Sequence, residues 1–223
     1  SRRDFLQRSA LAATAMSLVG RRDTSFGLEI VGDIPPATLI AGTPRDRGRT
    51  YGKLFKDEIA AFLEREIYRA FLDKPNPKGR LLKYAAACAE VIQKETPEIY
   101  EELLGMAEGT GLGPDEHVLL TLHEELYHKG EIKSVEHCTA VAAGPPSTTG
   151  ATYVGQTWDW MQSVFGLSRV LHWQRSSGPS LLAYSFPGLW VGAGLNSAGL
   201  ALCWTSAALG QKGQRAAVGL PAY

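Results

Sequence analysis

Apolar residues recur every three or four positions between about residue 43 and residue 127. This spacing places them on one face of a helix. It predicts four helices in the first half of the chain, namely one that Thr43-Pro44 begins and that reaches Phe71, one over 81–92, one from Thr96-Pro97 to Met106, and one over 115–127. Proline- and glycine-rich stretches at 75–79 and 109–114 separate them.

From Cys138 onward the period shortens to that of β-strands. The segments CTAVAA, ATYVGQ, RVLHWQ, LLAYSF, LWVGAGL and LALCWTS alternate with Ser/Gly/Pro clusters. Connections this short join antiparallel neighbours, because parallel strands need long crossovers. The pattern predicts an α+β fold in which the helices bury their apolar faces against an antiparallel sheet. Since this sheet lacks a layer on its far side, we expect the chain to be the front part of a longer protein.

Composition narrows the function classes. The 223 residues are 44% hydrophobic and 21% charged, as in an ordinary globular protein. With 23 basic and 23 acidic residues the net charge is zero, which argues against a nucleic-acid binder. Three cysteines (Cys88, Cys138 and Cys203) are too few, and odd in number, for a disulfide framework. An enzyme or a small-molecule binder remains.

The first residues resemble a targeting segment. Arg2 and Arg3 precede an uncharged, moderately apolar run from Ser9 to Gly20 that is too short for a membrane span. Paired arginines before such a run are typical of the twin-arginine export signal. We therefore predict that residues 1–22 address the chain to the twin-arginine export machinery, and that the protein is periplasmic or extracellular with no stable membrane span.

Two other motifs carry no functional prediction. His123 and His128 are five positions apart, which is about 500° around a helix, so the two imidazoles cannot face one metal ion. The Gly109–Gly113 stretch lies between two predicted helices and is typical of a helix end rather than of a phosphate-binding loop. The sequence predicts neither a metal site nor a cofactor.

Three features further along the chain are candidates for chemistry. Cys138 begins the first predicted strand, although cysteine is also a common buried apolar residue. Asp159 stands between Trp158 and Trp160 at the end of the next strand. Asn196 occupies a turn, 194–200, that could equally be an ordinary hairpin loop.

Together these motifs resemble the isopenicillin N acyltransferases (acyl-coenzyme A:6-aminopenicillanic acid acyltransferases) and their bacterial relatives. These are autoproteolytic members of the N-terminal-nucleophile hydrolase superfamily. The resemblance covers roughly 40–223 and includes GTP at 42–44 and LGMAEG at 104–109. The chain departs from the family at three positions, with His137 where the family usually has Gly, Thr157 where it has Asn, and Tyr51 where it often has His.

The resemblance implies an αββα sandwich, of which 40–137 would be the helical pro-part and 138–223 the first half of the sheet domain. It also implies that Cys138 cleaves the bond after His137 and then acts as an N-terminal nucleophile. Asp159 would hold the new amino group, and Asn196 would donate to the substrate or to the oxyanion. Lining residues would be Thr139, Trp158 and Trp160. The substrate would be a small acyl amide or acyl thioester, with the acyl group passed to water or to an amine.

Two alternatives stay open on the sequence alone. One is a conventional cysteine hydrolase without self-cleavage, in which His172 would be the base. The other is a periplasmic binding or structural domain that keeps the fold without chemistry.

Overall fold

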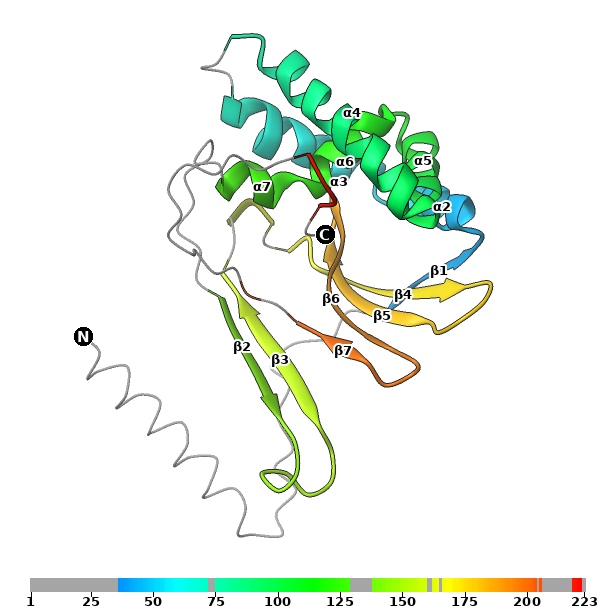
Figure 1. Cartoon of the computed structure of the whole chain (residues 1–223), viewed down its shortest axis with the longest axis vertical. Helices are drawn as coiled ribbons and strands as arrows, with labels where there is room; N and C mark the ends of the chain where they lie inside the picture. The colour runs from blue at the N-terminus through cyan, green and yellow to red at the C-terminus, as the bar shows by residue number, and fades with distance from the viewer. Residues whose placement is uncertain are drawn as a thin grey trace, which may run out of the picture. The chain divides into compact units, whose positions relative to one another are not determined.

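A helical layer and two β-sheets form the part of the chain that the computed structural model describes (Figure 1). The described residues are 36–71, 75–128, 138–159, 162–164, 166–203, 205 and 218–221. The fold is α+β, as predicted. The proposed export signal with Arg2 and Arg3 lies outside the described residues, and so do His137 and Trp160. Export and the roles of these residues therefore stay predictions.

Four of the described helices begin at a proline. Pro44, Pro77, Pro97 and Pro114 each occupy the first position of a helix, where the missing N–H costs nothing. Helical segments in chain order are α2 (Pro44–Leu54), α3 (Lys56–Phe62), η1 (Leu63–Tyr68), η2 (Arg69–Phe71), α4 (Pro77–Glu95), α5 (Pro97–Thr110), α6 (Pro114–Thr121) and α7 (His123–His128).

Two predicted helices are broken in the structure. The segment expected to run unbroken to Phe71 changes direction at Phe55 (φ −117°) and continues as α3, a π-helical turn and a 3₁₀ turn. The fourth predicted helix divides at Leu122 into α6 and α7. Hydrogen bonds of the i to i−4 type continue across Phe55 and Leu122, so the apolar spacing is the same on both sides of each break. Periodicity alone therefore could not show these breaks.

The larger sheet has five strands in the order β1-β4-β5-β6-β7. Their bounds are β1 Thr38–Gly42, β4 Arg169–Arg175, β5 Leu181–Phe186, β6 Leu189–Asn196 and β7 Ala201–Leu202. Strands β4 to β7 form the predicted antiparallel meander. Strand β1 pairs in parallel with β4, so the expectation of a purely antiparallel sheet is wrong at this edge. The connection between these two strands runs through the helical layer, and the rule for short connections does not apply to it.

The remaining strands form a separate hairpin. Strand β2 (Cys138–Ala143) matches the predicted segment, and β3 (Tyr153–Trp158) pairs with it antiparallel. A short 3₁₀ turn, η3 (Gln162–Val164), follows.

Among the described helices, none combines the length and the apolar character needed to cross a bilayer.

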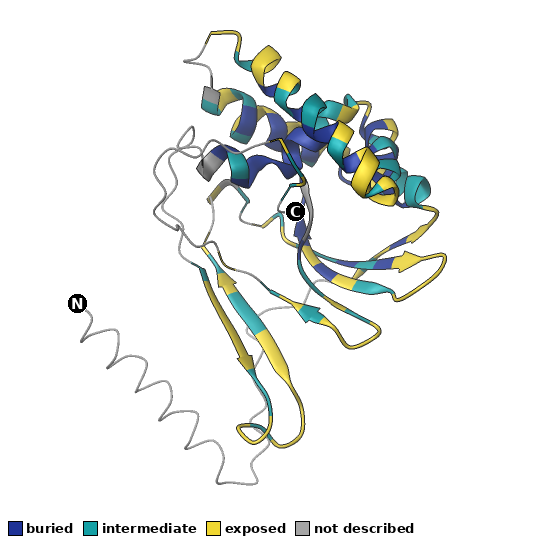
Figure 2. Cartoon of the chain, viewed as in Figure 1, coloured by how far each residue is buried: buried dark blue, intermediate teal, exposed yellow. Residues whose placement is uncertain are grey.

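The core lies between the helical layer and one face of the five-stranded sheet (Figure 2). From the sheet, Leu171, Trp173 and Phe186 are buried against helical residues such as Ile59 and Phe62. This confirms the prediction that the apolar helix faces pack on the sheet. The hairpin, in contrast, is mostly exposed.

Helices α2 and α5 approach each other more closely than side chains would allow. A Cβ atom at Gly48 would lie 1.9 Å from the Glu102 carbonyl oxygen, and one at Gly105 would lie 2.1 Å from the Arg45 carbonyl oxygen. Gly52 and Gly109 face the partner helix in the same way, one turn further along. Only glycine therefore permits this contact between the two backbones.

Candidate active site

The hairpin register determines which side chains share a face. Cys138 lies directly opposite Trp158, and Thr139 lies opposite Thr157. Side chains that are directly opposite on antiparallel strands point to the same face, and the next pair points to the other face. Cys138 and Trp158 therefore share one face. The backbone N–H of Thr139 donates to Thr157 Oγ1 at 3.2 Å, and both threonine side chains are exposed on the other face.

The face that carries Cys138 is turned toward the five-stranded sheet. The Trp158 ring lies 5.9 Å from the Tyr184 ring and 5.5 Å from the Phe186 ring, measured between centroids. Cys138 itself is half-buried, so its thiol is neither enclosed in the core nor fully in solvent. Asp159, which is exposed, directly follows the residue opposite Cys138. The structure thus brings Cys138, Trp158 and Asp159 to the same end of the hairpin.

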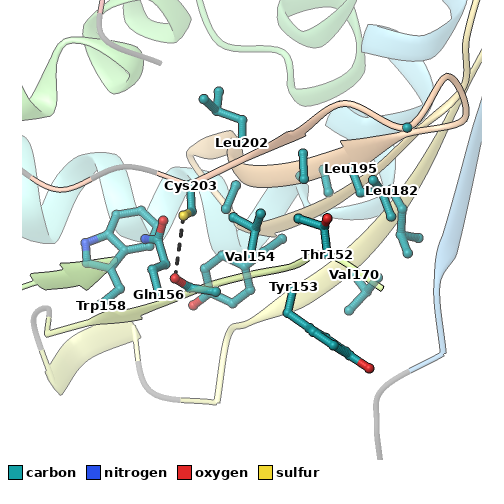
Figure 3. A pocket seen from close by; sticks show the side chains of 17 residues that line it. Thr152, Tyr153, Val154, Gln156, Trp158, Val170, Leu182, Leu195, Leu202 and Cys203 are labelled. Atoms are coloured by element: carbon teal, nitrogen blue, oxygen red, sulfur yellow. Dashed lines mark hydrogen bonds between the residues drawn. The ribbon is translucent and has the colours of Figure 1, made fainter. Parts of the chain in front are cut away.

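A cavity of about 960 Å³ lies between β3 and the open face of the larger sheet (Figure 3). Its wall is largely apolar and includes Val154, Gln156, Trp158, Tyr184, Leu182, Leu195, Leu202 and Cys203. The Cys203 thiol donates to the Gly155 carbonyl oxygen at 3.5 Å. Trp158 lines this cavity and Cys138 is its cross-strand partner, but Cys138 is not itself among the described residues of the cavity wall.

Asn196 lies elsewhere. It ends β6 opposite Leu181, and its Oδ1 accepts the backbone N–H groups of Ala198 (3.1 Å) and Leu200 (2.9 Å), which shapes the turn. It borders a different cavity, of about 650 Å³, together with Arg47 and Glu102 of the helical layer. The structure therefore does not bring Asn196 to Cys138. Asn196 borders the cavity next to the helical layer, whereas Trp158, the cross-strand partner of Cys138, lines the cavity on the other face of the sheet.

His172, the base in the conventional alternative, is half-buried on β4. Its neighbours Leu171 and Trp173 point into the core, so His172 points to the other face, on which the large cavity lies. It is not part of the cavity wall that the described residues form.

Sequence reasoning did not single out Tyr184, Phe186 or Cys203. The signal for Tyr184 was available, because alternation along the predicted strand places it on the same face as Leu182. Phe186 gave no such signal, since an irregularity in the pairing of β5 with β6 falls between Tyr184 and Phe186.

Two histidines of the helical layer, His117 and His123, are core residues. His117 and His123 are buried, and burial lowers the pKa of each to about 4, so both are neutral at physiological pH. His117 Nε2 is 2.8 Å from Thr110 Oγ1, and His123 Nδ1 is 3.0 Å from the Leu120 carbonyl oxygen. Within the described residues, no group of three or more His, Cys, Asp or Glu side chains is placed to hold a metal ion.

Comparison with known proteins links the chain to acyltransferases at the level of distant similarity. A relative from Emericella nidulans, the 40 kDa form of acyl-coenzyme A:6-aminopenicillanic-acid-acyltransferase, is 27% identical over 161 residues. The match covers 72% of this chain and 44% of the relative, so the chain spans less than half of that protein's length. No family model matches the chain.

Proposed function

We propose that this protein is an autoproteolytic cysteine acyltransferase or amidohydrolase of the N-terminal-nucleophile type, with Cys138 as its nucleophile. The proposal depends on one observation above all: a half-buried cysteine is the first residue of β2, and its cross-strand partner lines a large apolar cavity. The distant similarity to an acyltransferase supports the same class. On this proposal the complete fold is an αββα sandwich, with 40–137 as its pro-part and 138–223 as the first half of the sheet domain.

Maturation would begin with the thiol of Cys138. Its sulfur attacks the carbonyl carbon of His137, and the peptide C–N bond breaks as a thioester forms. The same break frees the amino group of Cys138, and water then hydrolyses the thioester, which releases the carboxyl group of His137 and regenerates the thiol. The pKa of a free thiol is about 8.5 and that of an α-amino group is about 8. The amino group of Cys138 is therefore well matched to take the proton of the Cys138 thiol.

In the mature protein the thiolate would attack an acyl amide or an acyl thioester. The acyl-enzyme then passes its acyl group to water or to an amine. Asp159 would hold the new ammonium group through a charge-assisted hydrogen bond, and its position at the same end of the hairpin as Cys138 supports this role. Trp158 would wall the acyl group, whereas Thr139 lies on the other face of the hairpin, and its position gives no support to a substrate contact. The position of Asn196 gives no support to its predicted role as an oxyanion donor.

The test is the intact mass of the full-length natural protein. We expect the wild type to separate into two fragments, the second of which begins at Cys138, whereas Cys138→Ala stays a single chain. Cys203→Ala is the matched control, because Cys203 is also half-buried and lines the cavity. It should be cleaved like the wild type. An uncleaved wild type, or a cleaved Cys138→Ala protein, would refute the proposal.

The same protein distinguishes the two alternatives. A conventional hydrolase with His172 as base predicts rapid alkylation of Cys138 by iodoacetamide but no new amino terminus. A domain without chemistry predicts that Cys138 is alkylated no faster than Cys203.

A further inference from the structure

The nucleophile-bearing hairpin forms a sheet of its own. Strands β2 and β3 pair with each other, and the five-stranded sheet is built from other strands. An isolated two-stranded hairpin is at best marginally stable in water. Its position therefore depends on the side chains that attach it to the larger sheet.

Aromatic rings supply that attachment at the end of the hairpin where Cys138 lies. The Trp158 ring packs against Tyr184 at 5.9 Å and against Phe186 at 5.5 Å. A second contact, from the Cys203 thiol to Gly155, lies three residues further back along β3. Of the two, only Trp158 is directly opposite Cys138.

Both partners of Trp158 are themselves fixed in place. Phe186 is 2% exposed and lies 5.6 Å from the ring of Phe62 in the helical layer. Tyr184 is 37% exposed, and its hydroxyl group lies 3.1 Å from the hydroxyl of Ser168. The indole is thus held between one ring anchored in the core and one ring anchored at the surface.

We infer that Tyr184 and Phe186 are positioning residues for Cys138. They hold Trp158, and Trp158 fixes the end of β3 that lies opposite Cys138. Side chains that are directly opposite on antiparallel strands have Cβ atoms about 5 Å apart, so a shift of the indole moves its partner as well. Because a misplacement of about 1 Å can lower a rate about 100-fold, this aromatic contact would control the self-cleavage step. The inference rests on the proposed function.

Tyr184 is the better of the two positions to test. Phe186 belongs to the buried core, so its truncation would destabilise the whole fold. Tyr184→Ala removes one side of the contact at a partly exposed site, and Tyr184→Phe keeps the ring while it removes the hydroxyl group. Leu39→Ala is the matched control, because Leu39 is an apolar residue of the same sheet, is exposed, at 54%, and is not part of the cavity wall that the described residues form.

Two measurements on the full-length natural protein decide the question. The first is the rate at which newly made precursor is cleaved before Cys138, followed by intact mass. We expect Tyr184→Ala to slow cleavage by about 10-fold or more, Tyr184→Phe to slow it less than Tyr184→Ala does, and Leu39→Ala to stay within about twofold of wild type. The second is amide hydrogen exchange, which should become faster in 138–143 and 153–158 of Tyr184→Ala and stay unchanged in α2 and α5.

Equal slowing by Tyr184→Ala and Leu39→Ala would overturn the inference, because it would show a general effect of lost apolar surface. Unchanged hydrogen exchange in the hairpin of Tyr184→Ala would also overturn it. If the wild type is not cleaved at all, the proposed function fails, and hydrogen exchange still shows whether Tyr184 holds the hairpin.

Discussion

Arg47 and Glu102 form a buried ion pair that joins α2 to α5. Glu102 is 2% exposed, and it accepts hydrogen bonds from Arg47 Nε at 3.0 Å and from the indole N–H of Trp173. Burial raises the pKa of Glu102, while Arg47 opposes that shift. Arg47 also donates to the Gly42 carbonyl oxygen at 2.9 Å. Each charge therefore has its partners inside the core, and neither could remain there alone.

We predict that Glu102→Gln lowers the free energy of unfolding by roughly 3–5 kcal/mol, because it leaves Arg47 buried without a counter-charge. Glu98→Gln is the control. Glu98 stands on the same helix and pairs with Arg175, but its side chain is 63% exposed. This variant should lose less than about 1 kcal/mol. Urea unfolding measures both values, and equal losses would contradict the argument.

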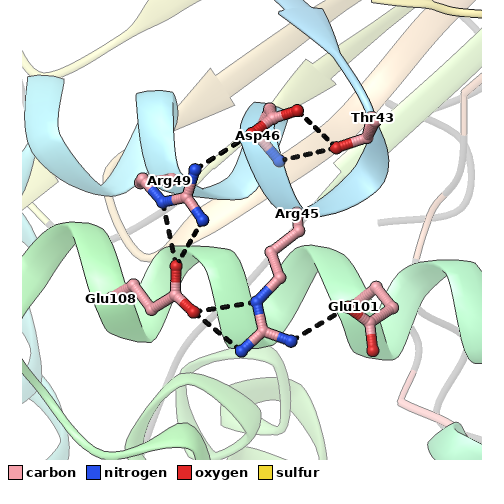
Figure 4. A network of polar contacts seen from close by, with 6 residues as sticks. All are labelled: Thr43, Arg45, Asp46, Arg49, Glu101 and Glu108. Carbon is pink, nitrogen blue, oxygen red and sulfur yellow. Dashed lines mark hydrogen bonds and ion pairs between the residues drawn. The ribbon is translucent and has the colours of Figure 1, made fainter.

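Among the elements, α2 and α5 form the closest pair, and two kinds of contact join them. Glycines allow the backbones to touch, and a network of exposed ion pairs lies alongside (Figure 4). In that network Arg45 and Arg49 each reach Glu108 at 2.7 Å. Exposed pairs of this kind contribute little individually. The glycine contact is therefore the stronger determinant of how closely the helices pack.

Gly48→Ala tests this contact. Its Cβ would lie 1.9 Å from a backbone oxygen of α5, so the helices must separate. We predict a loss of about 3 kcal/mol in unfolding free energy. Gly113→Ala serves as the control, since φ there is −71° and the nearest atom to a new Cβ is 3.6 Å away. It should cost about 1 kcal/mol or less. Thermal and urea unfolding of the two variants give the comparison, and a Gly48→Ala protein as stable as Gly113→Ala would refute it.

The sequence predicted elements well where the signal is local. Proline marked the start of α2 and α5, as predicted, and the alternation from Cys138 to Ala143 matched β2. It could not reveal β1, whose five residues carry no alternation and whose parallel partner β4 is distant in sequence. Such pairings depend on the whole assembled core.

In the candidate site, too, the sequence could place only those residues whose arrangement depends on a local signal. Cys138 and Asp159 could be placed together from the sequence, because a short connection joins their strands. Asn196 could not, since the face it occupies depends on how the meander packs against α5. The ring contacts of Trp158 with Tyr184 and Phe186 bridge two separate sheets, and no periodicity along one strand encodes such a contact.

At the scale of the whole molecule, two neutral histidines are built into the core. His123 is fully buried, with its ring 6.4 Å from Phe62 and 6.4 Å from Phe186, so it joins the helical layer to the larger sheet. His117 is 3% exposed within the helical layer. Burial lowers the pKa of each to about 4, against about 6.5 in an unfolded chain.

These lowered pKa values make stability depend on pH in a defined direction. Below about pH 6.5 both histidines bind a proton in the unfolded chain. In the folded protein the same two side chains stay neutral until the pH reaches about 4. The stability that these two neutral histidines contribute is therefore greatest above pH 6.5, and it is lost as the pH falls from about 6.5 to about 4. Between pH 7 and pH 5 we predict a loss of roughly 2 kcal/mol for each histidine. Urea unfolding at the two pH values measures this loss.

A His117→Gln/His123→Gln double variant, which is less stable at pH 7, is the control. In this variant the difference in unfolding free energy between pH 7 and pH 5 should be smaller than in the wild type by roughly 4 kcal/mol. A difference as large as that of the wild type would mean that other groups cause it.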